Sequence, residues 1–171
     1  MNEKQKKVMV GMSGGIDSSV TAYMLQQEGY EVEGIYLKLH NRTDGYHERN
    51  LGYIEDVAKF LNIKYHILDL ANEFSKEVYD YFVDSYLTGT TPNPCVKCNK
   101  QIKFGSMLKF AKEHGADFLA TGHYAKTDGE FFYEADDKTK DQSYFLSQVD
   151  KEALKYMMFP LSTYKKEDIV K

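Results

Sequence analysis

The sequence has only two cysteines among its 171 residues, which are too few for a disulfide framework. Their CxxC spacing favours a reducing, intracellular setting. The sequence also lacks any apolar run near the ~20 residues that a membrane-spanning helix requires, and residues 1–7 lack the apolar stretch of a secretory signal. We therefore expect a cytoplasmic protein with no membrane partner.

The sequence also has fewer basic than acidic residues: 22 Lys and Arg residues against 26 Asp and Glu residues, which gives a net charge of −4. This balance disfavours a general nucleic-acid coat protein, which would be basic overall. One stretch departs from the average, because residues 97–112 contain no acidic residue and five lysines: Lys97, Lys100, Lys103, Lys109 and Lys112. From the residues alone, a solvated helix face is the simpler interpretation, and a phosphate-binding surface is the alternative.

The sequence does contain an alternation of short apolar runs and longer periodic stretches, without internal repeats or low-complexity linkers. The apolar runs predict strands at residues 7–12, 31–39, 65–70 and 117–121, and Asp128-Gly129 predicts a hairpin joining 124–126 to 130–133. The periodic stretches predict helices at 18–28, 51–62, 73–87, 99–114, 151–158 and 163–171, while 142–149 fits a strand or a helix. This alternation is typical of an α/β fold with a doubly wound, mostly parallel sheet.

A glycine-rich turn joins the first strand to the first helix, with the sequence Gly11-Met12-Ser13-Gly14-Gly15-Ile16-Asp17-Ser18. Adjacent glycines allow several N–H groups to point at one anion, and the following helix adds its own unpaired N–H groups. Asp17 cannot bind phosphate directly, so we expect it to hold a Mg²⁺ ion that bridges phosphates. The turn matches neither GxGxxG nor the lysine-containing GxxxxGK[ST] loop. The structural alternative is a tight turn capped by Asp17 or Ser18.

The second unusual segment is Thr91-Pro92-Asn93-Pro94-Cys95-Val96-Lys97-Cys98-Asn99. We predict that Cys98 lies at the start of a helix beside lysines, where both the helix N-terminus and the ammonium groups lower the pKa of a thiol. A zinc site lacks enough ligands with a finger spacing, and the prolines with Lys97 between the cysteines do not resemble a thioredoxin-type pair. A buried structural cysteine pair remains the alternative to reactive thiol chemistry.

Together these motifs resemble a known family. Residues 11–18 match the SGGxDS loop of the ATP pyrophosphatase superfamily, which cleaves ATP between the α and β phosphates. With the blocks GTTPNPCVKCNKQIKFG (89–105), ATGHYA (120–125), KDQSYFL (140–146) and FPL (159–161), the chain resembles the bacterial tRNA-specific 2-thiouridylases over nearly its whole length.

The resemblance implies that ATP adenylates the 2-oxygen of the wobble uridine of a tRNA, and that AMP leaves as sulfur arrives from a persulfide or sulfide donor protein. It implies that residues Gly11–Ser18, Leu37 and Gly122 bind ATP with Mg²⁺ at Asp17, and that Cys98 is the first catalytic cysteine. The target base would meet Asn93, Pro94 and Cys95, and the tRNA would meet Lys140, Asp141 and Gln142, with the basic helix of Lys97, Lys100 and Lys103 positioning phosphates.

The sequence departs from the family in several places. Many members have aspartate where Cys95 stands, so Cys95 and Cys98 are candidates for two ligands of a 4Fe-4S cluster. Residues 40–50 lack the family's usual residues, and the family's second catalytic cysteine lies in a later region. We expect residues 1–160 to form the catalytic domain and 161–171 to start a truncated following segment, with the central and C-terminal tRNA-binding domains absent. The alternatives are another tRNA sulfurtransferase of the superfamily and a truncated ATP- or metal-binding module without turnover.

Overall fold

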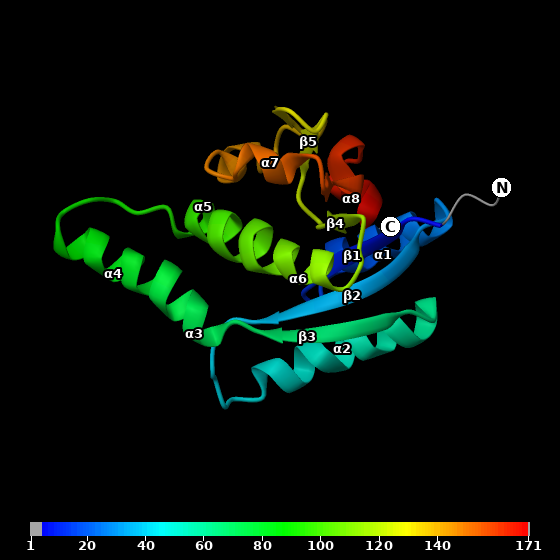
Figure 1. Ribbon diagram of the computed structural model, residues 1–171, viewed down its shortest axis with the longest axis horizontal. Helices are drawn as coiled ribbons and strands as arrows, with labels where there is room; N and C mark the ends of the chain where they lie inside the picture. The colour runs from blue at the N-terminus through cyan, green and yellow to red at the C-terminus, as the bar shows by residue number, and fades with distance from the viewer. Residues whose placement is uncertain (1–4, 171) are drawn as a thin grey trace.

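The computed structural model describes residues 5–170, and its centre is a five-stranded sheet (Figure 1). Every pairing in this sheet is parallel, and the strand order is β3-β2-β1-β4-β7. The strands are β1 (Lys7–Met12), β2 (Glu31–Lys38), β3 (Lys64–Asp69), β4 (Phe118–Ala120) and β7 (Met157–Met158).

Helices cover both faces of the sheet, which confirms the doubly wound prediction (Figure 1). On one face, α1 (Ile16–Gln27) and α2 (Tyr46–Leu61) pack through Leu25 and Ile54 against Val8 and Val10 of β1. On the other face, a continuous helix formed by α5 (Pro94–Cys98), η2 (Asn99–Met107) and α6 (Leu108–Glu113) packs against Met9, Ile35 and Leu119. Alternate residues of β1 therefore face opposite layers, as a strand buried on both sides requires.

The order of the strands positions the site. The chain runs from β1 through β2 to β3 at one edge, and then returns to the other side of β1 to form β4. The sheet thus has a topological switch point between β1 and β4, and ligands of such sheets bind in the crevice outside the carboxyl ends of these strands.

The remaining elements lie at the edges. α3 (Ala71–Phe74), η1 (Ser75–Tyr79) and α4 (Asp80–Leu87) follow one another and extend away from the sheet as an arm (Figure 1). The predicted hairpin is confirmed as β5 (Ala125–Thr127) and β6 (Phe132–Glu134). The chain then forms η3 (Ser143–Leu146), α7 (Lys151–Leu154), η4 (Pro160–Thr163) and α8 (Lys166–Ile169). Within residues 5–170, no helix combines the length and the apolar character needed to cross a membrane.

Four predicted elements differ from the structure. The helix expected at 99–114 begins at Pro94, because the Asn93 side chain accepts a hydrogen bond from the Val96 N–H (3.2 Å) and proline suits the first helical position. The helix expected at 151–158 ends at Leu154, because Met157 and Met158 extend the sheet beside β4. Residues 142–149 contain only a 3₁₀ turn, and the terminal helix is limited to α8, with Lys171 outside the described residues.

α1 is buried on two sides. Ala22 and Leu25 pack on the sheet, whereas Val20 and Met24 pack with Leu161, which is fully buried, and with Ile169. Residues that follow position 160 therefore contact the helix that begins at the glycine-rich turn. The domain boundary at residue 160 stays a prediction.

Candidate active site

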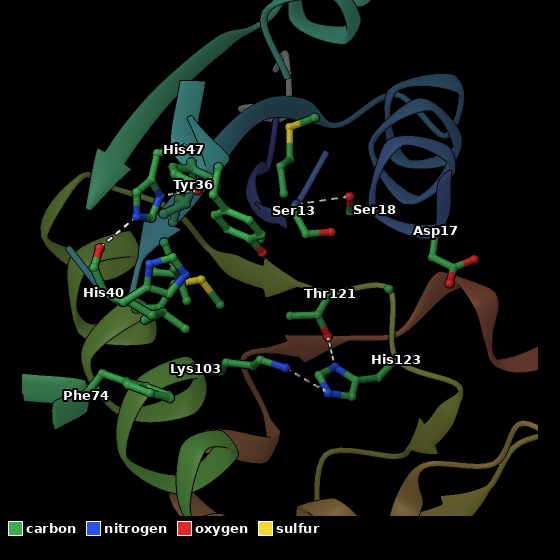
Figure 2. A pocket seen from close by; sticks show the side chains of 18 of the residues that line it. Ser13, Asp17, Ser18, Tyr36, His40, His47, Phe74, Lys103, Thr121 and His123 are labelled. Atoms are coloured by element: carbon green, nitrogen blue, oxygen red, sulfur yellow. Dashed lines mark hydrogen bonds between the residues drawn. The ribbon is translucent and has the colours of Figure 1, made fainter. Parts of the chain in front are cut away.

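A cavity of about 460 Å³ opens at the carboxyl ends of β1, β2 and β4, at the topological switch point (Figure 2). Its size lies within the range of small-molecule sites. Its polar side contains Ser13, Asp17 and Ser18 from the glycine-rich turn. Its apolar side contains Leu37, Leu39, Tyr46, Phe74 and Met107. One cavity thus joins a polar turn at a helix start to a pocket of apolar side chains.

The glycine-rich turn folds back on the first turn of α1. The Ser18 hydroxyl donates to the Gly15 carbonyl (3.0 Å) and accepts from the Ser13 N–H (3.3 Å). Gly14 has a φ of +83°, and a Cβ there would lie 3.2 Å from the Asn50 carbonyl oxygen, so this position requires glycine. Gly11 and Met12 line the cavity with the serines, whereas Gly14, Gly15 and Ile16 complete the turn beside it.

Gly122 allows the segment after β4 to approach the start of α1. A Cβ at Gly122 would lie 3.0 Å from the Asp17 Cβ and 3.2 Å from the Ser18 backbone nitrogen. Both Gly122 and Leu37 line the cavity. The structure therefore brings together the glycine-rich turn and the two distant positions expected to bind the same ligand.

Asp17 is bound by residues from two distant parts of the chain. Its Oδ1 accepts from the Lys166 ammonium (2.5 Å) and from the Tyr124 hydroxyl (3.2 Å). Burial, together with the nearby Asp17 charge, raises the pKa of Tyr124, so its hydroxyl stays protonated and donates. The Asp17 carboxylate keeps about a third of its surface exposed. A single carboxylate at the start of a helix fits the expected Mg²⁺ role, because Mg²⁺ binds through one or two carboxylates and substrate phosphates.

His123 provides a buried nitrogen beside Lys103 in the same cavity (Figure 2). Because the Lys103 ammonium can only donate, His123 Nε2 accepts from it (3.5 Å), and Nδ1 carries the proton that it donates to the Thr121 hydroxyl (2.7 Å). Burial, with a smaller contribution from the Lys103 charge, lowers the pKa of His123 to about 3. His123 is therefore neutral near physiological pH.

This pKa predicts a pH-dependent stability. Between the unfolded value of about 6.5 and the folded value of about 3, the unfolded chain binds a proton that the folded chain does not, so the free energy of unfolding falls as the pH falls. Lowering the pH from about 7 to about 5 should cost about 2 kcal/mol through His123. Urea unfolding at both pH values should show this loss in the wild type and a correspondingly smaller loss in His123→Asn. Equal losses in the two proteins would contradict the assignment.

The two cysteines occupy different environments. Cys95 is exposed in the first turn of α5, whereas Cys98 is partly buried, in the last position of that segment. The prediction that Cys98 lies at the helix start is wrong, because the helix begins at Pro94 and Cys95 is nearer its N-terminus. Burial raises the pKa of Cys98, and the charge of Lys103 only partly opposes this effect. The expected lowering of the Cys98 pKa is therefore wrong as well.

The local helix geometry nevertheless relates Cys98 to the cavity. η2 is a π-helix, in which backbone hydrogen bonds join residues five apart, and such segments are frequent at functional sites. Lys103 follows Cys98 by five residues and lines the cavity, as does Met107. Cys98 and Lys103 consequently lie one turn apart on one side of the same helix.

The cysteines do not complete a metal centre from this chain alone. In residues 5–170, no group of three or more His, Cys, Asp and Glu side chains is arranged to hold a metal ion. A 4Fe-4S cluster is held by about four thiolates, and the chain contains two cysteines. The residues present do not fit a complete cluster site.

The different environments of the thiols predict different reaction rates. At about pH 7, iodoacetamide should modify Cys95 at least about tenfold faster than Cys98, because Cys95 is exposed and the Cys98 thiol is partly buried and protonated. The Cys98 rate should increase as the pH is raised. Mass spectrometry of Cys95→Ser and Cys98→Ser, each followed over time, measures the two rates separately. A faster reaction at Cys98 near neutral pH would show that its pKa is low.

The residues expected to meet tRNA have varied roles in the structure. Asp141 faces inward, since its carboxylate accepts from the Ala135 N–H (2.8 Å) and the Ser143 hydroxyl (2.7 Å). Gln142 lines the cavity and accepts from the Tyr124 N–H (3.1 Å), whereas Lys140 is exposed. Asn93, at the other predicted contact, caps the cysteine-bearing helix.

The lysines of the basic helix do not share one face. Lys103 points into the cavity, whereas the Lys97 ammonium lies over the Tyr81 ring of α4, 5.6 Å from its centroid. Lys100 belongs to η2 and is partly buried. Only part of the predicted basic surface is therefore available to phosphates outside the cavity.

Comparison with known proteins identifies the family of this chain. Residues 6–171 match the family model described as the tRNA methyl transferase HUP domain. The chain belongs to this family. It is 92% identical over 167 residues to the tRNA-specific 2-thiouridylase MnmA 1 of Aliarcobacter butzleri, and 58% identical over 164 residues to the tRNA-specific 2-thiouridylase MnmA of Sulfurimonas denitrificans. These relatives confirm the resemblance to the tRNA 2-thiouridylases.

The alignments cover the two proteins unequally. They include 98% and 96% of this chain but 48% of each relative. The chain thus spans about half the length of the curated relatives that it matches.

Solved structures confirm the fold of this HUP domain. A 4-thiouridine synthetase in complex with RNA and ATP superposes with a TM-score of 0.64 at 21% identity, over 96% of this chain and 39% of that one. A predicted subunit of a tRNA methyltransferase from Methanocaldococcus jannaschii superposes with a TM-score of 0.59 at 18% identity, over 96% of this chain and 72% of that one.

Sequence reasoning missed the aromatic residues at the apolar side of the cavity, and it also missed Tyr124, His123 and Lys166 near Asp17. Tyr124 and Lys166 are 107 and 149 residues from Asp17 in the chain, so no local pattern connects them. The absence of lysine from residues 11–18 was the one available signal, since it left the phosphate site without a nearby cation.

Proposed function

We propose that this chain is the ATP-binding catalytic part of a tRNA 2-thiouridylase. The observation that carries the proposal is a single cavity that joins the glycine-rich turn to Lys103, on the same helix as Cys95 and Cys98. The thiouridylases with 92% and 58% identity support thiolation as the reaction.

The two sides of the cavity suit the two halves of ATP. The triphosphate is placed on the polar side, where the turn and the start of α1 present N–H groups and the serine hydroxyls. The adenine is placed among the apolar residues, which include Leu37 and Phe74. Mg²⁺ held at Asp17 would neutralise phosphate charge when bound. Phosphate oxygens would also compete with Asp17 for the Lys166 ammonium.

The proposed reaction has an adenylation step and a sulfur-transfer step. The 2-oxygen of the wobble uridine attacks the α-phosphorus of ATP, and pyrophosphate leaves. With a persulfide donor protein, the terminal sulfur passes to Cys98 and the resulting Cys98 persulfide attacks C2, and AMP leaves with the former 2-oxygen. A thiol reductant then attacks the Cys98 sulfur, so that the S–S bond breaks, 2-thiouridine is released and Cys98 is left in a mixed disulfide that a further thiol reduces. With sulfide as the donor, sulfide attacks C2 directly and AMP leaves in the same way. Cys98 is the proposed sulfur-carrying thiol, although burial raises its pKa and the charge of Lys103 opposes that effect only in part.

The tRNA is the proposed macromolecular substrate. Anticodon loops present unpaired bases, so a wobble uridine reaches a cavity without unwinding a helix. Lys140 and Lys100 are proposed phosphate contacts, and the exposed residues Asn93 and Cys95 are placed to contact the base.

The proposal is tested with the 171-residue chain, ATP, Mg²⁺, sulfide and an anticodon stem-loop that contains a wobble uridine. We expect 2-thiouridine in the RNA and AMP in solution, both measured by chromatography and mass spectrometry. Binding of ATP without AMP formation would favour an ATP-binding module without turnover, for which the small number of cysteines is the argument. Absence of ATP binding would contradict both functions.

A further inference from the structure

Four aromatic side chains form a cluster at the apolar side of the cavity, where β2 ends and α2 begins. The His40 ring lies over His47 and Tyr46, with centroids 4.5 Å and 4.9 Å apart, and Tyr36 meets His47 edge-on at 5.9 Å. All four residues line the cavity. Figure 2 shows His40 and His47 on the side of the cavity away from Asp17.

Hydrogen bonds fix the position of this cluster. His47 Nε2 lies 2.7 Å from the His40 carbonyl oxygen, which only accepts, so Nε2 donates. In neutral His47, Nδ1 then accepts from the Tyr36 hydroxyl (2.7 Å). Because the His47 ring is buried, it has little freedom to move, and its hydrogen bond to the His40 carbonyl holds that backbone in place at the end of the strand.

The side chain of His40 has a ring nitrogen without a bonding partner. Its Nδ1 is buried and forms no hydrogen bond with any residue in the part of the chain that the structure describes. Burial, followed by the charges of His47 and Arg42, lowers the pKa of His40, so the ring is neutral at physiological pH. A buried polar atom without a partner is unusual in a folded protein, and here it belongs to a residue that lines a ligand-sized cavity.

We propose that His40 is a specificity-determining residue, whose Nδ1 forms a hydrogen bond with the edge of the purine base of ATP. This inference rests on the proposed function, because it assigns the base of the same nucleotide to the apolar side. Leu37 and Phe74 provide apolar contact for the faces of the base. The neutral imidazole of His40 can form a hydrogen bond with the edge of the base and places no charge beside it. His47 and Tyr36 are positioning residues for His40.

Three substitutions of His40 in the full chain test whether Nδ1 is the nitrogen that binds the base. His40→Phe keeps a ring and removes both nitrogens, His40→Asn keeps a polar atom near the Nδ1 position, and His40→Gln keeps one near the Nε2 position. Calorimetry measures the affinity of each protein for ATP and for inorganic tripolyphosphate, which has no base.

We expect His40→Phe and His40→Gln to weaken ATP binding about 5- to 10-fold, the range of one hydrogen bond. His40→Asn should stay within about twofold of wild type. The tripolyphosphate affinity should be unchanged in all three, which also shows that the variants are folded.

Two results would overturn the inference while leaving the proposed function intact: equal ATP affinity in His40→Phe and wild type, or equal losses for ATP and tripolyphosphate. Failure of the wild type to bind ATP would overturn the proposed function and this inference together.

Discussion

With a persulfide donor protein and a thiol reductant, Cys98→Ser should lower sulfur transfer to the anticodon stem-loop by at least about 10³-fold, because a hydroxyl cannot carry the transferred sulfur. ATP affinity should remain within about twofold of wild type, since Cys98 is outside the cavity lining. Quantification of 2-thiouridine by mass spectrometry and of ATP affinity by calorimetry measures the two effects separately. Thiolation by Cys98→Ser at the wild-type rate would refute the assignment.

The chain offers a matched control at Cys95. Cys95→Asp removes the second sulfur from an exposed position, and the proposed route does not use that sulfur, so we expect activity within about fivefold of wild type. A loss of activity as large as that of Cys98→Ser would contradict a mechanism in which Cys98 alone carries the sulfur, because it would show that both cysteine sulfurs are needed.

Asp17→Asn should lower AMP formation from ATP about 10²- to 10³-fold. The substitution keeps the shape of the side chain and removes the charge that suits Mg²⁺ at the phosphates. It also removes the ion-pair partner of Lys166. Initial rates of AMP formation at saturating RNA, measured over a range of Mg²⁺ concentrations, should show the loss at every concentration.

Tyr124→Phe is the control for this substitution. It removes one hydrogen bond to Asp17 and leaves the carboxylate and Lys166 in place, so the loss should be at most about fivefold. If Asp17→Asn forms AMP as fast as Tyr124→Phe, the role of the Asp17 charge is wrong.

The sequence predicted the parts of the fold that depend on local patterns. The strands at 7–12 and 31–39 and the glycine-rich turn are recognisable because apolar runs and adjacent glycines have strong local preferences. The start of the cysteine-bearing helix differs from the prediction because prolines disfavour a helix interior but not its first position. Pro94 instead occupies the first helical position, where its missing N–H has no cost, and Asn93 caps the end.

The parts that the sequence did not predict depend on tertiary contacts. Met157 and Met158 form a strand because β4 offers an open edge, although the preceding residues favour a helix. The pairing of Asp17 with Lys166 depends on Leu161 packing against α1, which no nearby residue indicates. The low pKa of His123 likewise results from burial between segments that are distant in the chain.

The most direct test of the central claim follows the 2-oxygen of the uridine. A stem-loop is prepared with ¹⁸O at the 2-position of the wobble uridine and is incubated with the chain, unlabelled ATP, Mg²⁺ and sulfide. If the cavity transfers AMP to that oxygen, the label appears in the phosphate of AMP, in an amount equal to the 2-thiouridine formed. Formation of 2-thiouridine with unlabelled AMP, or with ADP and phosphate, would contradict the account.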